Sequence, residues 1–311
     1  MTDVPPLAIA PSVRDALRAG RPVVALESTL ITHGFAAPLN LEAARRAEAA
    51  VRGAGAEPAT VAVHDGRLRV GLSDGDLEEL AGEPAPRKAS RSTLAMALVE
   101  GGWAGTTVAA TMIAAHLAGI RVFATGGIGG VHRGGAQSLD ISADLDELAR
   151  TPVLVVCAGP KSMLDVDLTL EYLETRGVPV LGWQTAELAG FYSRGTGRML
   201  AGSVADAARA ARVAQAHWNV GLDSGIVIAA PIPEHAALSA EDAESAIDRA
   251  VAESGVAGVH GTASTPWILA RVAELTQGRS VTANLALIEN NAGIAAEVAA
   301  ALAPRSSGSF A

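Results

Sequence analysis

The sequence predicts an α/β protein, built as a single three-layer α/β/α domain around a largely parallel sheet that also contains antiparallel strands. Short, fully apolar runs alternate with Ala-rich amphipathic stretches along the chain, as strands alternate with their covering helices in such folds. No stretch is a linker long enough to separate two domains, so residues 1–311 are expected to form one unit. The Ser-rich residues from about 304 onward are expected to form a disordered tail.

The predicted strands are short apolar segments bounded by polar or turn-forming residues. They cover residues 22–27, 60–64, 67–70, 121–125, 153–157, 179–182 and 225–229. Asp65 and Gly66 separate the second of these strands from the third, and a two-residue Asp-Gly loop is a strong signal for a β-hairpin. The sheet is therefore expected to contain an antiparallel element.

The predicted helices are amphipathic or Ala-rich, and several carry signals at their ends. They cover residues 12–19, 41–53, 77–80, 93–101, 107–118, 144–150, 164–176, 204–220, 241–254, 265–276 and 284–302. Asn40 is expected to cap the second helix, and Asn284 could cap the last one. Glu147 lies where a capping box would place it near the start of the sixth helix.

Composition limits the class of partner and the compartment. The chain has 24 basic and 33 acidic residues, which gives a net charge of −9. An acidic surface argues against a nucleic-acid polymer or an anionic membrane as the main partner, but it does not exclude one small basic pocket for a phosphate. The single cysteine, Cys157, excludes an internal disulfide, and residues 1–11 lack the pattern of a signal peptide. A cytoplasmic location is therefore expected.

The two lysines are unusual because the other 22 basic residues are all arginines. An amine can lose its proton and attack a carbonyl carbon, whereas a guanidinium always stays charged. Lys88 lies beside Arg87 and could be an ordinary surface cation. Lys161 follows a buried strand in a turn of small residues, where loss of hydration would lower the pKa of its amine. Lys161 is therefore a candidate nucleophile.

Two further strand ends carry polar residues of interest. Glu27 directly follows an apolar strand, where a carboxylate is costly unless it is paired or protonated. A raised pKa would suit a general acid, while a carboxylate that caps a helix is an equally good reading. Residues 125–135 are rich in glycine and include His132 and Arg133. The segment could bind a phosphate through backbone N–H groups and these two cations, or it could simply be a flexible loop.

An acidic segment follows the glycine-rich stretch. Asp140 and Asp144 are four residues apart, with Ser142 between them. These oxygen ligands could hold a hard divalent cation such as Mg²⁺ or Mn²⁺ through water. Taken alone, the segment is more typical of an acidic helix start.

Taken in order, these segments resemble the pseudouridine-5′-phosphate glycosidase family, which is related to indigoidine synthase A. The resemblance extends over residues 16–302 and rests on residues 24–29 (VALEST), 87–91 (RKASR), 106–109 (TTVA), 124–134 (ATGGIGGVHRG), 140–145 (DISADL) and 156–162 (VCAGPKS). It implies a compact α/β/α fold, a homotrimer and one Mn²⁺ per subunit. It also implies reversible cleavage of the C–C glycosidic bond of pseudouridine 5′-phosphate to uracil and ribose 5-phosphate.

The resemblance also implies a role for each matching residue. Glu27 would be the proton donor, Lys161 the covalent nucleophile and Asp140 the manganese ligand. The substrate would be bound by the sugar-phosphate partners Ser142, Ala143 and Asp144, the phosphate partners Thr125 and His132, the substrate contacts Lys88 and Val108, and Asn284, which would read the uracil.

The chemistry of the expected reaction explains why an amine and a separate acid are needed. A C–C bond is not cut by protonation of a leaving oxygen, which is how glycosidases with paired carboxylates work. Ring opening followed by a Schiff base between Lys161 and the sugar would provide the missing electron sink. The sequence does not decide in which direction the reaction runs in the cell. It also leaves a different C-linked nucleotide as an alternative substrate.

Two alternatives belong to other functional classes. The glycine cluster at residues 126–130 could indicate a nicotinamide-dependent Rossmann oxidoreductase, although the G-x-G-x-x-G spacing is absent. The chain could also be a non-catalytic phosphosugar-binding protein on the same fold. Release of uracil by the purified protein would exclude the second alternative.

Overall fold

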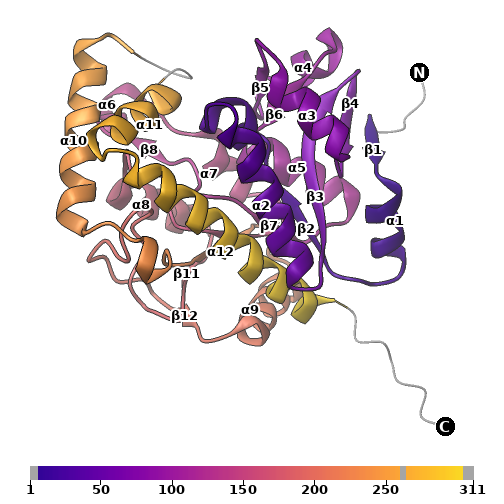
Figure 1. Cartoon of the computed structure of the whole chain (residues 1–311). Helices are drawn as coiled ribbons and strands as arrows, with labels where there is room; N and C mark the ends of the chain where they lie inside the picture. The colour runs from indigo at the N-terminus through magenta and orange to yellow at the C-terminus, as the bar shows by residue number, and fades with distance from the viewer. Residues whose placement is uncertain (1–5, 260–263, 304–311) are drawn as a thin grey trace.

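The computed structural model describes residues 6–259 and 264–303, and within them eleven strands form one mixed sheet (Figure 1). The sheet has the order β1-β4-β3-β2-β7-β9-β13-β11-β12, with β6 paired to β3 and β5 to β6. Its strands are β1 (Leu7–Ile9), β2 (Val23–Leu26), β3 (Glu57–His64), β4 (Arg67–Val70), β5 (Arg87–Ala89), β6 (Ala104–Thr106), β7 (Val122–Ala124), β9 (Leu154–Cys157), β11 (Val180–Trp183), β12 (Ser203–Val204) and β13 (Ile226–Ala229). The expected tail from residue 304 lies outside the described residues.

Most of the sheet is parallel, as predicted. Strand β3 is the exception, because it runs antiparallel to β4 and β6. The predicted hairpin between β3 and β4 is confirmed, with His64 opposite Arg67. Asp65 and Gly66 between them have φ values of 48° and 73°, the left-handed backbone that a two-residue hairpin loop requires. A separate two-stranded sheet pairs β8 (Val131–His132) with β10 (Leu164–Asp165).

Helices cover both faces of the sheet, which confirms the predicted three-layer α/β/α class (Figure 1). On one face lie α2 (Leu39–Gly53), α9 (Ala207–Asn219), α10 (Ala240–Val256), α11 (Ser264–Leu275) and α12 (Arg279–Leu302). The other face carries α1 (Pro11–Arg18), α4 (Leu94–Glu100), α5 (Val108–Ala118), α7 (Ala143–Leu148) and α8 (Val166–Thr175). The remaining helices are α3 (Asp74–Gly82), α6 (Gly135–Ser138), the π-helix η1 (Leu30–Gly34) and the 3₁₀-helix η2 (Glu234–Ala236).

The central strands are apolar on both faces, which explains their continuous hydrophobic sequence. In β2, Val24 and Leu26 pack into the core beneath α2 and α12, while Val23 and Ala25 pack into the core beneath α1 and α5. Side chains on a strand alternate between faces, so a strand buried on both sides needs an apolar residue at every position. The same alternation appears in β9, where Leu154 and Val156 face one core and Val155 and Cys157 face the other.

Helix α12 is a core helix of this fold. It is long and apolar enough to cross a membrane by length and composition, with 56% of its most apolar window buried. It packs against α2 and α9 and against strands β2, β7 and β9. Its apolar sequence is therefore accounted for by the interior of the protein.

Three predictions about helix ends are wrong. Asn40 lies inside the first turn of α2, where its side-chain amide donates to the carbonyls of Ile31 and Ala81 at 3.2 and 3.1 Å. Asn284 lies within α12, which begins five residues earlier at Arg279. The third concerns Glu147, which lies in α7.

The capping box predicted with Glu147 does not form. Ser142 is the N-cap of α7, and its hydroxyl accepts from the backbone N–H of Asp144 at 3.2 Å. The buried carboxylate of Glu147 instead bonds to Arg91 and to the hydroxyl of Thr151. Both partners satisfy a buried charge, a stronger requirement than the capping of one free amide.

Candidate active site

Three neighbouring parallel strands, β2, β7 and β9, end at the same edge of the sheet. Leu26 pairs with Ala124, and Ala124 pairs with Val156, so the residues that follow lie at one level. A cavity of about 370 Å³ opens beside these strand ends and is also lined by residues of η1, α11 and α12. Cavities in parallel sheets are expected at this edge, because the loops that follow the strands converge there.

Glu27 follows β2 and is held in one orientation by two hydroxyl groups. Its side chain is buried, with 5% of the residue exposed, yet it lines the cavity. The hydroxyls of Thr29 and Thr125 donate hydrogen bonds to its two carboxylate oxygens. Thr125 can do so because it follows β7, the strand that pairs with β2. The carboxylate is therefore fixed at the cavity wall.

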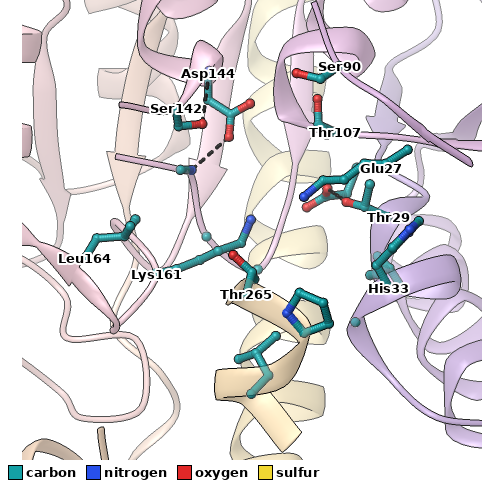
Figure 2. A pocket seen from close by; sticks show the side chains of 18 of the residues that line it. Glu27, Thr29, His33, Ser90, Thr107, Ser142, Asp144, Lys161, Leu164 and Thr265 are labelled. Carbon is teal, nitrogen blue, oxygen red and sulfur yellow. Dashed lines mark hydrogen bonds between the residues drawn. The ribbon is translucent and has the colours of Figure 1, made fainter. Parts of the chain in front are cut away.

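Lys161 lies in the turn after β9 and extends into the cavity. Its backbone N–H donates to the carbonyl of Ile128 at 3.0 Å, which ties the turn to the glycine-rich loop. Gly159 has a φ of +83°, and a Cβ there would lie 2.8 Å from the carbonyl oxygen of Ala189, so only glycine fits. Figure 2 shows Lys161 and Glu27 reaching into the cavity from opposite sides.

Lys88 supplies a second amine to the same cavity. It lies on β5, which joins the sheet through β6. Burial lowers the pKa of Lys88, the positive charge of Lys161 lowers it further, and Asp144 and Glu27 act in the opposite direction. The two lysines of the sequence therefore share one cavity and repel each other electrostatically.

Asp144 anchors the start of α7 against its surroundings. One carboxylate oxygen accepts the backbone N–H of Ala109 at the start of α5, and the other accepts that of Gly129, both at 2.9 Å. A Cβ at Gly129 would lie 2.2 Å from the hydroxyl of Ser142, so the glycine loop and α7 are in direct contact. Figure 2 shows Asp144 and Ser142 together at the cavity wall.

Asp140 and His132 lie at the cavity rim with Nδ1 of His132 4.0 Å from a carboxylate oxygen of Asp140. Within residues 6–259 and 264–303, no group of three or more His, Cys, Asp or Glu side chains is arranged to hold a metal ion. Asp144 is already engaged by two backbone amides. One carboxylate with one imidazole fits a hard cation that keeps most of its water or binds through a substrate phosphate.

Most of the residues singled out by sequence line this one cavity. They are Glu27, Lys88, His132, Asp140, Ser142, Ala143, Asp144, Lys161 and Asn284. Thr125 reaches the cavity indirectly through Glu27. The side chain of Val108 is completely buried in the core beneath α5 and does not line the cavity, which leaves only its backbone for a substrate contact. Its neighbour Thr107 lines the cavity instead.

Sequence reasoning gave no role to several cavity residues. Thr29 binds Glu27 and is visible in the sequence only as part of the segment after β2. His33 lies on η1, and Thr265, Pro266 and Leu269 come from α11, whose place beside η1 is a tertiary contact. Nothing in the sequence marks residues 30–34 as a π-helical turn, so no local signal pointed to His33.

Comparison with known proteins identifies the family. Residues 12–301 match the family described as indigoidine synthase A like protein. The chain is 54% identical over 297 residues to the pseudouridine-5′-phosphate glycosidase of Sorangium cellulosum, covering 95% of this chain and 93% of that protein. It is 52% identical over 294 residues to the protein of that name from Deinococcus radiodurans, covering 94% of each.

Two solved structures are also similar over almost the whole chain. The prealnumycin C-glycosynthase AlnA, in complex with ribulose 5-phosphate, has a TM-score of 0.88 and 42% identity, covering 96% of this chain and 97% of that one. An indigoidine synthase A-like protein from Thermotoga maritima has a TM-score of 0.87 and 31% identity, covering 98% and 99%. These relatives confirm the predicted fold class and the prediction that the chain is an enzyme. The chain belongs to the family of indigoidine synthase A like proteins.

Proposed function

We propose that this protein is a pseudouridine-5′-phosphate glycosidase, a lyase-type enzyme that reversibly cleaves the C–C bond between uracil and ribose 5-phosphate. The observation that supports it most is the placement of Glu27 and Lys161 at opposite sides of one cavity. An acid and an amine are the two groups that the chemistry requires. Relatives named for this activity are about half identical to the chain.

The proposed reaction begins with opening of the ribose ring. Glu27 donates a proton to the ring oxygen, and the bond between that oxygen and C1′ breaks. The amine of Lys161 then forms a bond to C1′ and gives up a proton. The C1′–C5 bond breaks, uracil keeps its electron pair and takes a proton at C5, and the sugar is left as an imine on Lys161. Water hydrolyses the imine to ribose 5-phosphate and restores the amine.

The other predicted residues are proposed to bind the substrate. The segment 142–144 would contact the sugar phosphate, with further contacts from Thr125, His132, Lys88 and the backbone of Val108. Asn284 would read the uracil, and its amide oxygen lies 3.6 Å from the position of a Cβ on Gly126 in the glycine loop. Because the carboxylate of Asp144 accepts two backbone amides, its part in phosphate binding is to hold that loop in place.

Asp140 is proposed to hold one Mn²⁺, with His132 beside it. When bound, such an ion would neutralise phosphate charge and order water near the sugar. Removal of divalent cations with EDTA is then expected to lower activity, and added Mn²⁺ to restore it. A homotrimer and a cytoplasmic location are proposed from the family resemblance, and the trimer can be measured by sedimentation.

Free uracil is the product to measure. Purified protein incubated with pseudouridine 5′-phosphate and Mn²⁺ is expected to release uracil. Borohydride should trap ribose 5-phosphate covalently on the protein, because it reduces an imine to a stable amine. Lys161→Ala should abolish both the release and the trapping, and Lys161→Arg should do so as well, since a guanidinium keeps its proton.

Two outcomes would contradict the proposal. Absence of uracil release by the folded wild-type protein would leave a non-catalytic phosphosugar-binding protein. Trapping of the sugar on Lys88, with Lys161 unmodified, would exchange the proposed roles of the two lysines.

The nicotinamide alternative has a weaker basis. Its only motif is the glycine cluster, and these glycines serve close packing in this fold. A Cβ on Gly127 would lie 2.6 Å from the ring of Phe191, and one on Gly129 would meet Ser142. A thermal shift that depends on a nicotinamide nucleotide would be needed to revive it.

A further inference from the structure

His33 is a cavity residue to which the proposed mechanism gives no role. It lies on the π-helix η1, six residues after Glu27, and its side chain lines the cavity. Figure 2 shows it on the same side as Glu27 and Thr29, away from Ser142 and Asp144. π-Helical turns are uncommon and often occur at functional sites, where they direct a side chain. A part-buried imidazole in this position needs a partner for each ring nitrogen.

The ring nitrogen Nδ1 already has its partner. It lies 2.6 Å from the hydroxyl oxygen of Thr32. The hydroxyl oxygen of Thr32 also lies 3.3 Å from the carbonyl oxygen of Ser28, to which it can donate its one hydrogen. Both hydrogen bonds form together only when Nδ1 carries the ring hydrogen, and that tautomer leaves a lone pair on Nε2. Within the described residues, Nε2 makes no hydrogen bond to the protein, so it is available to a molecule bound in the cavity.

The imidazole is kept in its neutral form. Burial lowers the pKa of His33, and the positive charge of Lys88 lowers it further. A protonated ring would have two donors and no acceptor. The neutral ring presents an acceptor nitrogen to the cavity when its hydrogen is on Nδ1.

Apolar side chains line the cavity on η1, which carries His33, and on α11, which contacts η1. Leu30 and Phe35 come from η1 and the residue after it, and they share the cavity with apolar residues of α11 and α12, namely Pro266, Leu269 and Ile288. The polar residues of α7 and the glycine loop lie elsewhere in the cavity wall (Figure 2). The flat faces of a base such as uracil fit against these apolar side chains, and a phosphate fits beside the polar residues of α7 and the glycine loop.

The chemistry of uracil shows what one isolated acceptor can distinguish. A uracil joined to ribose through C5 carries an N–H at N1. When the base is joined through N1, as in uridine, a C–H takes that place, while N3–H and the two carbonyls keep their positions. An amide such as Asn284, which donates and accepts, suits the edge that both bases share. A lone acceptor suits the one N–H that differs.

We propose that His33 carries its hydrogen on Nδ1, and that its Nε2 accepts a hydrogen bond from N1–H of the base and thereby selects C-linked over N-linked uracil nucleotides. The proposal rests on the proposed function and adds a specificity-determining residue to it. With an N-linked base, Nε2 would face a C–H group and remain buried without a partner, which weakens binding.

Binding without turnover tests the selection. In a Lys161→Ala background, calorimetry measures the dissociation constants of pseudouridine 5′-phosphate and uridine 5′-phosphate. We expect the C-linked nucleotide to bind about 10-fold to 100-fold more tightly. Addition of His33→Leu, which fills similar space without an acceptor, should reduce this ratio to about twofold. His33→Gln, whose side-chain oxygen can accept, should retain part of it.

The matched control is His116→Leu, since His116 is exposed on α5 and does not line the cavity. It should leave the ratio unchanged. A ratio that survives both His33→Leu and His33→Gln, or a ratio near one before either change, would overturn the role of His33. Failure of the proposed function has a different signature, in which wild-type protein releases no uracil although the binding ratio still depends on His33.

Discussion

The amine of Lys88 is the cavity cation whose pKa is lowered by its surroundings, first by burial and then by the charge of Lys161. A protonated Lys88 therefore costs folding free energy, because the unfolded chain offers the same amine full hydration. The sequence pointed to both lysines by their rarity. It could not show that they share one cavity, because they lie on β5 and after β9, which meet only in the folded sheet.

The lowered pKa of Lys88 predicts a pH-dependent stability difference. Between the folded-state pKa and the unfolded value of about 10.5, the unfolded chain binds more protons, so stability contributed by this group rises with pH. Lys88→Met should therefore raise the free energy of unfolding at pH 7, and the gain should shrink as the pH approaches 10.5. Urea titrations at several pH values measure it. The exposed Arg212 of α9 supplies the control, since Arg212→Met should give no such trend.

Cys157 should be inert despite its place near the proposed nucleophile. It is completely buried at the end of β9, and burial raises the pKa of its thiol to about 12. Reaction requires the thiolate, so a thiol reagent such as iodoacetamide should label the protein only after denaturation. Labelling of the native protein at the rate of a free thiol would mean that this strand end opens.

At the residue scale, the sequence predicted which side chains belong to the site better than it predicted the residues that they contact. Glu27 and Lys161 were found because each follows an apolar strand, which is a local pattern. The threonine contacts of Glu27 depend on the pairing of β2 with β7, which local patterns do not contain. Asp144 was expected to bind substrate, but its two backbone partners come from α5 and the glycine loop.

At the element scale, the glycine loop and α7 form one unit that shapes the polar part of the cavity wall. Gly129 permits this contact because Ser142 and Asp144 occupy the space of a side chain, with atoms 2.2 and 2.7 Å from the point where a Cβ would lie. Glycine in this loop thus allows the loop and α7 to pack closely against each other.

Gly129→Ala should separate the loop from α7. We expect a loss of about 2 kcal/mol in the free energy of unfolding, since the added methyl group has no space, together with at least a tenfold loss of activity. Thermal and urea unfolding measure the first, and product release the second. Gly53→Ala is the matched control, because nothing lies within 4 Å of that position at the end of α2. The control should be neutral or slightly stabilising.

The sequence predicted which segments form helices better than it predicted where those helices begin. Periodicity found α2 and α12, but Asn40 and Asn284 were taken as caps because asparagine is common there. In the fold, Asn40 connects η1 to the end of α3, and Asn284 faces the cavity from inside α12. Both roles are tertiary contacts. An asparagine near a helix start can therefore be a cap or can make a tertiary contact, and the sequence alone does not distinguish the two roles.

At the scale of the whole molecule, both helical layers pack on one continuous sheet. The cores on its two faces share strands β2, β7, β9 and β13. Unfolding of one core would therefore expose the strands that also form the other. The alternation of strands and helices predicted this class. The strand order and the short strands β5 and β6 were not predicted, because pairing partners are chosen by long-range packing.

A shared sheet predicts cooperative unfolding. Trp103 belongs to the small core around η1 and α3, whereas Trp183 belongs to the core beneath α12. Loss of helix followed by circular dichroism and exposure of tryptophan followed by fluorescence should give the same midpoint in urea. Two separated midpoints would contradict the single-domain expectation.

The order of strands also sets a length. Only β7 lies between β2 and β9, and neighbouring strands are about 4.8 Å apart, so the sheet itself spaces the two strand ends that precede Glu27 and the turn of Lys161 about 10 Å apart. Backbone hydrogen bonds maintain that interval, whatever happens in the surrounding loops. Substitutions in those loops are therefore expected to reshape the cavity wall while the distance between the two strand ends stays the same.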